Sequence, residues 1–243
     1  MRLLLISNST NTDGGYLDHV TDTIVTFLGD ADHVLFLPFA MHDIAGYGKK
    51  TCARLNEMGI ECRSAPDVAD WARAVKDAGA IFVGGGNTFR LLNVLRDSKL
   101  LAAIHNRVEN GLPYMGASAG ANVACPTIRT TNDMPIVQPR SFKALNLVPF
   151  NINPHYIDRD PDFPHQGESR ELRIQEFHEE NSEPVIGLRE GSFLTVEGSR
   201  MQLDGSTGAR LFRRDKAPKE VAPGTYLDFL LGNDRQVPHS EDR

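Results

Sequence analysis

The sequence feature that most constrains the fold is a series of short apolar runs, each followed by a longer stretch with helical spacing. The runs cover residues 2–7, 33–39, 80–83 and 113–116, and the first three show no alternation of polar and apolar residues. This pattern is typical of strands in a parallel sheet whose two faces are both covered by helices. We therefore expect an open, doubly wound α/β sheet.

The stretches between the runs predict the covering helices. Apolar residues recur at helical spacing over residues 16–28, 44–58, 67–78 and 98–110. In the last stretch Ser98 is a suitable N-cap, and Gly111 is a suitable end of the helix.

The second half of the chain has a different pattern. Residues 126–167 are rich in Pro, Asn and Asp, with an apolar run at 145–152, and residues 168–179 look helical. Short apolar runs separated by glycine-containing turns follow at 185–188, 193–197, 201–203 and 209–212. We expect a small antiparallel C-terminal extension within a single domain, residues 1–243, and a frayed polar tail from Gly232.

Composition narrows the classes of partner and compartment. The formal net charge of −6 disfavours a nucleic-acid backbone or an anionic membrane as the main partner. No apolar stretch reaches the roughly 20 residues of a spanning helix, and the N-terminal run is shorter than the roughly 7–15 residues of a signal-peptide core. Cys52, Cys62 and Cys125 form no spaced cluster, so we expect free, mostly buried thiols and a cytoplasmic protein.

A G-x-S-x-G motif, residues 116–120, follows a predicted strand and precedes a helix-like run. Small residues allow a sharp strand-to-helix turn there, which would expose the hydroxyl of Ser118 at the carboxyl edge of the sheet. The amide of Ala119 would then lie at the start of a helix and could donate to an oxyanion. The alternative is a turn that needs glycine only for close packing.

A second glycine cluster, residues 84–86, also follows a strand. It matches neither the dinucleotide-binding nor the P-loop pattern. Because ligands of open α/β sheets bind outside the carboxyl ends of the strands, we expect this loop to meet the Ser118 turn, with the amide of Gly86 in the oxyanion site. The alternative is a tight turn without a ligand.

A serine nucleophile requires a base, and His155 is the preferred candidate because it follows a predicted strand end and Pro154 restricts the backbone before it. His42 and His165, in loops, remain alternatives. Asp133 and Glu190 are both loop acids that could orient the imidazole, and the residues alone do not decide between them.

Metal catalysis has less support. The chain has no H-E-x-x-H motif, and the acids and histidines between His155 and His165 are the one candidate group for a divalent ion. Cys125 could be a thiol nucleophile but lacks the glycines of the Ser118 turn. We expect no metal and no cofactor.

Several segments together resemble the peptidase E family of α-aspartyl dipeptidases, in order from residue 1 to about 230. They read LLLISNST, FVGGGNTF, GASAGANVACPTIRTTNDMPIV, NINPH and GLREG. The resemblance implies a flavodoxin-like sheet related to the class I glutamine amidotransferase fold. It also implies hydrolysis of dipeptides that carry an N-terminal aspartate.

The resemblance assigns roles to individual residues. Ser118 matches the nucleophile, His155 the base, and Gly86 and Ala119 the oxyanion hole. Both acids match positions linked to the catalytic centre, with Glu190 as the third member of the triad. The substrate-binding candidates are Arg170, which matches the residue that holds the aspartate carboxylate, together with Asn87 and Thr127.

The expected function is therefore that of a serine exopeptidase that cleaves Asp-X dipeptides through an acyl-enzyme. The expected partners are small peptides, not nucleic acid or membrane, and the protein is expected to be a monomer or a homodimer. One alternative is a cyanophycinase-like or amidotransferase-like amide or isopeptide hydrolase. The other is a ligand-binding protein without catalytic activity on the same fold.

Overall fold

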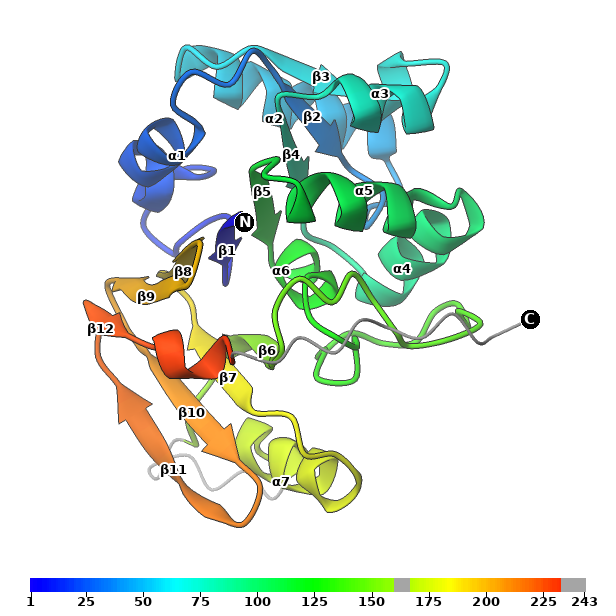
Figure 1. Ribbon diagram of the computed structural model, residues 1–243. Coiled ribbons are helices and arrows are strands. Elements are labelled where there is room, and N and C mark those ends of the chain that lie inside the picture. Colours follow the sequence, from blue (N-terminus) through cyan, green and yellow to red (C-terminus); the bar gives the residue numbers. More distant parts are fainter. Residues whose placement is uncertain (160–166, 233–243) are drawn as a thin grey trace.

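The parallel sheet expected from the apolar runs is present in the computed structural model, which describes residues 1–159 and 167–232 (Figure 1). Five parallel strands lie in the order β3-β2-β4-β5-β1. Their bounds are β1 Arg2–Ile6, β2 Val34–Leu37, β3 Cys62–Ser64, β4 Ala80–Val83 and β5 Tyr114–Ala117. This is the flavodoxin-like order 2-1-3-4-5 with the first strand of the chain in the fifth position, so the fold prediction is confirmed.

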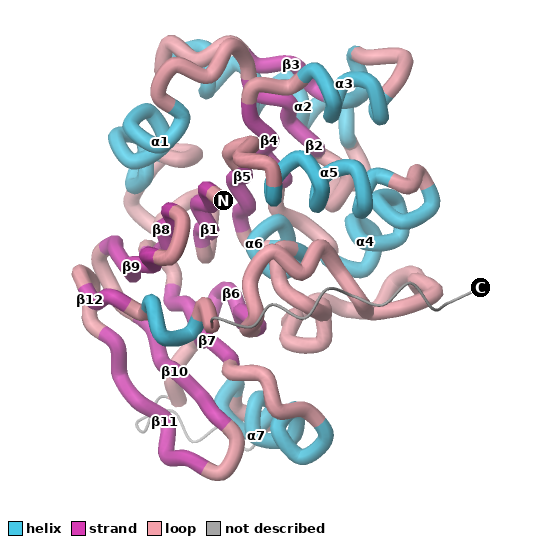
Figure 2. Tube along the Cα trace, viewed as in Figure 1, coloured by secondary structure: helices cyan, strands magenta, loops and turns pink. Residues whose placement is uncertain are grey.

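The two faces of this sheet are covered by different helices (Figure 2). Leu3 and Leu5 of β1 pack with one cluster of buried residues, whereas Leu4 and Ile6 pack with the other, because successive strand side chains point to opposite faces. The second cluster includes η1 Asp18–Val20, α1 Thr21–Leu28 and α2 Ile44–Glu57. The first includes η2 Ala65–Asp67, α3 Trp71–Asp77, α4 Thr88–Asp97, α5 Leu100–Glu109 and α6 Ala119–Val123.

The C-terminal extension is divided between two sheets. Strands β8 Ser192–Glu197, β9 Arg200–Gly205 and β12 Thr225–Tyr226 extend the main sheet beyond β1, with antiparallel pairing, and η3 Asp228–Leu230 follows. A second sheet has the order β11-β10-β7-β6. It consists of β6 Asn151–Tyr156, β7 Val185–Arg189, β10 Ala209–Arg213 and β11 Lys216–Val221. Only β6 and β7 are parallel in it, and α7 Arg170–Glu180 packs on it through Ile174.

The capping residue predicted for α5 belongs to the preceding helix. The Ser98 hydroxyl donates to the carbonyl of Val94 at 2.6 Å, so Ser98 ends α4. Lys99, in the left-handed region at φ 59°, is the residue that turns the chain into α5. The end of α5 is as expected, since Gly111 follows it with φ +99°.

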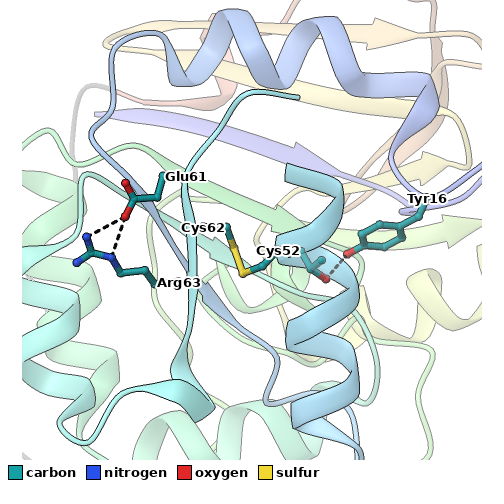
Figure 3. The surroundings of a disulfide bond; sticks show 6 residues. Tyr16, Cys52, Glu61, Cys62 and Arg63 are labelled. Atoms are coloured by element: carbon teal, nitrogen blue, oxygen red, sulfur yellow. Dashed lines mark hydrogen bonds and ion pairs between the residues drawn. A yellow bond between two sulfur atoms is a disulfide. The ribbon is translucent and has the colours of Figure 1, made fainter. Parts of the chain in front are cut away.

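The prediction of three free thiols is wrong for two of them. Cys52 on α2 and Cys62 on β3 form a disulfide, shown in Figure 3, with their Cα atoms 5.0 Å apart. The turn at Gly59, where φ is +79°, returns the chain from α2 to the neighbouring strand and brings the two cysteines together. Cys125 is free and buried, and burial raises its pKa well above the usual value for a thiol. The cysteines therefore do not support a reducing compartment.

Across residues 1–159 and 167–232, no helix has both the length and the apolar composition that crossing a membrane requires. The tail that was expected to be frayed lies outside the described residues from position 233 on.

Candidate active site

Ser118 lies at a sharp turn between β5 and α6. Its backbone has φ 53° and ψ −109°, a conformation that is strained for a residue with a side chain. The glycines of the motif are required by close approach: a Cβ on Gly116 would meet the backbone of Gly120, and one on Gly120 would meet the carbonyl of Val83. The turn therefore needs small residues at these two positions, and it leaves the Ser118 side chain half-buried.

His155 lies between Ser118 and Glu190. Its Nε2 is 2.8 Å from Ser118 Oγ, and its Nδ1 is 2.6 Å from Glu190 Oε1. Both distances fit the tautomer in which Nδ1–H donates to the carboxylate and Nε2 accepts from the hydroxyl. The structure thus brings together a hydroxyl, an imidazole and a carboxylate in the arrangement that activates a serine.

The structure gives Asp133 a different set of contacts. Its Oδ2 accepts from the backbone N–H of Thr88 at 2.7 Å and from the Thr131 hydroxyl at 3.1 Å. It therefore holds the first turn of α4, and no hydrogen bond joins it to His155 among the described residues. Of the two acids that the sequence left open, Glu190 is the one beside the imidazole.

Asn87 is the N-cap of α4, and both ends of its amide are engaged. Its Oδ1 accepts from Arg90 N at 3.0 Å, and its Nδ2 donates to the Met134 carbonyl at 2.8 Å. Thr127 is buried, and its hydroxyl accepts from Asn151 at 3.2 Å. Within residues 1–159 and 167–232, no hydrogen bond joins Thr127 to Ser118, His155 or Glu190.

The two expected oxyanion donors have free amides. Neither Gly86 N–H nor Ala119 N–H has a hydrogen-bond acceptor within the described ranges. Gly86 has φ +132°, and a Cβ there would lie 2.7 Å from the carbonyl oxygen of Ala40, so only glycine fits. The preceding Gly85 packs against Ser118, and its amide donates to the hydroxyl of Tyr47 at 3.0 Å, a contact that no pattern in the sequence predicts.

Arg170, the first residue of α7, is a partly buried cation that could bind a carboxylate. Burial lowers its pKa, the neighbouring Arg173 lowers it further, and Asp133 opposes both effects. No ion pair or hydrogen bond to its guanidinium is present in the part of the chain that the structure describes. Two other arginines have different surroundings: Arg129 donates to Asn181 Oδ1 at 3.5 Å, and Arg159 is exposed.

Of the remaining candidates, only His42 is among the described residues. His42 is exposed in the loop before α2, and His165 lies outside the described residues, as does Asp160. Within residues 1–159 and 167–232, no three His, Cys, Asp or Glu side chains are grouped so as to hold a metal ion.

Known proteins similar to this chain are peptidases. The model of peptidase family S51 matches residues 3–204. A peptidase E of Streptomyces coelicolor is 52% identical over 231 residues, covering 95% of each chain. A probable α-aspartyl dipeptidase of Drosophila melanogaster is 44% identical and covers 94% of this chain and 97% of its own.

A solved peptidase structure from an acI-B1 actinobacterium has the same fold, with a TM-score of 0.72 and 18% identity over 93% of this chain and 96% of its own. The fold and the Ser–His–Glu arrangement define a serine-type hydrolase. The chain belongs to peptidase family S51, and the resemblance found in the sequence is confirmed.

Proposed function

We propose that this protein is a serine exopeptidase that hydrolyses dipeptides with an N-terminal aspartate through an acyl-enzyme. The observation that carries the proposal is the unbroken chain of short contacts from Ser118 Oγ through His155 to Glu190, 2.8 and 2.6 Å long. The S51 family match and the α-aspartyl dipeptidase relative support the reaction and the substrate class.

In the proposed reaction, Ser118 Oγ attacks the carbonyl carbon of the aspartyl residue while His155 Nε2 accepts the hydroxyl proton. The negative charge that develops on the carbonyl oxygen accepts hydrogen bonds from Gly86 and Ala119. His155 then donates its proton to the amide nitrogen, the C–N bond breaks, and the second amino acid leaves. Water attacks the aspartyl ester by the same route in reverse, and Glu190 stabilises the imidazolium in both halves.

Selection of aspartate is assigned to Arg170. A guanidinium binds a carboxylate with two parallel hydrogen bonds, which a neutral amide cannot match. Among the described residues, the longer-range attraction of Asp133 opposes the effect of partial burial on this cation. A substrate carboxylate would form an ion pair with Arg170, so the binding free energy would depend on that one negative charge. Asn87 contributes to this site by joining α4 to the loop that carries Asp133, through its bond to the Met134 carbonyl.

The finer expectations on assembly and location are part of the same proposal. In this proposal the protein is a single domain over residues 1–243, is a monomer or homodimer in the cytoplasm, and has no nucleic-acid partner. The net charge of −6 supports the last point. The pairing of Cys52 with Cys62 gives this location no support.

The test compares wild type, Ser118→Ala and the exposed control Ser199→Ala on Asp-Leu, Glu-Leu, Asn-Leu and β-Asp-Leu. We expect wild type and the control to cleave Asp-Leu best, and Ser118→Ala to lose at least about 10³-fold in kcat while still binding the dipeptide. Faster cleavage of the β-linked peptide would favour the amide or isopeptide hydrolase. Full activity in Ser118→Ala would refute the mechanism, and no cleavage by wild type would favour a binding protein.

A further inference from the structure

Ile6, the last residue of β1, and the two residues that follow it contact the backbone of each element that carries a residue of the proposed triad. The Ile6 carbonyl accepts from the Ser118 amide at 2.9 Å. The next two residues, Ser7 and Asn8, are polar yet only 0% and 2% exposed. Buried polar groups are costly unless they are hydrogen-bonded, so the partners of these two side chains indicate what they do.

Ser7 joins the strand of the base to the strand of the acid. Its Oγ accepts from the His155 amide at 3.0 Å and donates to the Leu188 carbonyl at 2.8 Å. The pairing of β6 with β7 shifts between Pro154 and Tyr156, so His155 lies outside the ladder, with φ 52°. The Ser7 hydroxyl thus gives the displaced His155 amide an acceptor that its own sheet does not supply.

Asn8 holds the residue that follows the acid. Its Oδ1 accepts from the Gly191 amide at 2.7 Å, and its Nδ2 donates to the Thr10 carbonyl and to Asn11 Oδ1 at 2.9 and 2.7 Å. Gly191 has φ +82°, and this turn sets the direction in which Glu190 leaves β7. One amide side chain therefore fixes both the acid turn and the loop after β1.

These bonds cross from one sheet to the other. Ser118 directly follows β5 of the main sheet, whereas His155 lies in β6 and Glu190 directly follows β7 of the second sheet. We infer that Ser7 and Asn8 are positioning residues that hold His155 and Glu190 in line with Ser118, an inference that rests on the catalytic roles proposed above. Neither side chain touches substrate; each acts through the backbone of a triad element.

The expected effect is large because a displacement of about 1 Å at a reacting centre can lower the rate roughly 100-fold. Ser7→Ala removes the hydroxyl that accepts from the His155 amide and donates to the Leu188 carbonyl, so we expect kcat for Asp-Leu to fall roughly 10- to 100-fold. The KM is expected to change less than about threefold, because the proposed aspartate site on α7 is untouched. Asn8→Ala is expected to act in the same direction.

The matched control is Thr51→Val, which removes another fully buried hydroxyl. Thr51 is 0% exposed, its Oγ1 lies 3.1 Å from the Tyr16 hydroxyl, and it belongs to α2, which carries none of the proposed triad residues. The measurements are kcat and KM on Asp-Leu, the rate at which a fluorophosphonate labels Ser118, and the folded fraction by circular dichroism at the assay temperature. Ser7→Thr, which keeps the hydroxyl, is expected to recover part of the lost kcat.

The inference is supported if Ser7→Ala and Asn8→Ala, folded at the assay temperature, lose both kcat and labelling rate while Thr51→Val keeps them. Equal kcat in all three variants, or a loss that follows the unfolded fraction, would overturn it. If Ser7→Ala does not fold, Asn8→Ala alone decides between these outcomes. A wild type that neither cleaves Asp-Leu nor takes up the label would instead refute the proposed function.

Discussion

Glu190 and Asp133 carry the same chemical group but have different partners, and those partners separate their tasks. Glu190 Oε1 lies 2.6 Å from the imidazole Nδ1, whereas Asp133 accepts from a helix N–H and a threonine hydroxyl. A carboxylate beside the imidazole stabilises the imidazolium that forms in the transition state, so its loss lowers kcat. A carboxylate at a helix start stabilises a local turn instead.

We therefore expect Glu190→Gln to lower kcat by roughly 10³–10⁴, since an amide can neither fix the productive tautomer nor balance the imidazolium charge. Asp133→Asn is the matched control and is expected to change kcat less than about tenfold, because an amide oxygen can still accept from the helix N–H. Steady-state kinetics on Asp-Leu measure both. A near-normal rate in Glu190→Gln with a collapse in Asp133→Asn would transfer the role of the acid to Asp133.

Arg170 and Arg173 offer a matched pair on one helix. Arg173 forms an ion pair with Glu168 at 3.2 Å and is half-exposed, whereas Arg170 has no such partner within the described residues. Arg170→Met is expected to lower kcat/KM for Asp-Leu roughly 10- to 100-fold, the value of a charge-assisted hydrogen bond, and to leave a neutral dipeptide unaffected. Arg173→Met is expected to leave kcat/KM unchanged for both dipeptides. Unchanged preference for Asp-Leu over Asn-Leu in Arg170→Met would remove this assignment.

At the scale of elements, apolar patterning predicted the strands β1, β2, β4 and β5 and the helices α1, α2, α3 and α5, and it missed strands with little apolar surface. β11 is mostly exposed, and its sequence KAPKEV has no strand pattern that could be told from a loop. β3, with the sequence CRS, is too short to show one. Both strands pair with a neighbour that patterning had found, so their formation depends on tertiary contacts rather than on their own residues.

The disulfide shows the same limit, because the two cysteines meet only once α2 and β3 are packed. Closing a loop of ten residues restricts the unfolded chain, and its loss is expected to lower the free energy of unfolding by roughly 2–3 kcal/mol. Reduction of wild type should therefore lower its denaturation midpoint. The Cys52→Ala/Cys62→Ala double variant should be less stable than oxidised wild type and insensitive to reductant.

Thiol titration of the denatured chain gives an independent check. One free thiol, Cys125, is expected before reduction and three afterwards. Three free thiols in protein that has never been reduced would contradict the pairing.

At the scale of the whole molecule, the site forms where the two sheets meet, and this explains how much of it could be predicted. Ser118 was found from a motif of five neighbouring residues whose geometry is local. The choice between Glu190 and Asp133, and the contacts of Ser7, depend on how the second sheet lies against the first. No local pattern contains that information, since Ser7 and Leu188 are 181 residues apart.

The second sheet also has an ion-pair network that links its strands at the end nearest the triad. Arg189, directly before the proposed acid, binds both carboxylate oxygens of Asp158 at 2.7 and 2.9 Å and also pairs with Glu220 at 2.9 Å. Arg210 adds a further pair with Glu171 at 3.0 Å. The network thus ties the segment after β6 to β7, β10, β11 and α7.

This network predicts how stability depends on pH. Hydrogen bonding from Arg189 lowers the pKa of Asp158 below its ordinary value of 3.8, with partial burial opposing the shift. Because the folded pKa is the lower one, the unfolded state binds more protons in this range, and stability rises with pH. The contribution of Asp158 is therefore fully present above pH 3.8 and is lost as the pH falls through the folded pKa.

Asp158→Asn should accordingly be less stable than wild type near neutral pH, and the difference should shrink as the pH falls below 3.8. The control is Asp215→Asn. Its side chain is 93% exposed, and its pairing with Arg214, at 4.0 Å, is weak, so the variant should match wild type at every pH. Urea unfolding at a series of pH values measures both variants against wild type. A constant difference for Asp158→Asn down to about pH 2.5 would show that its loss acts through packing, not through the charge that Arg189 binds.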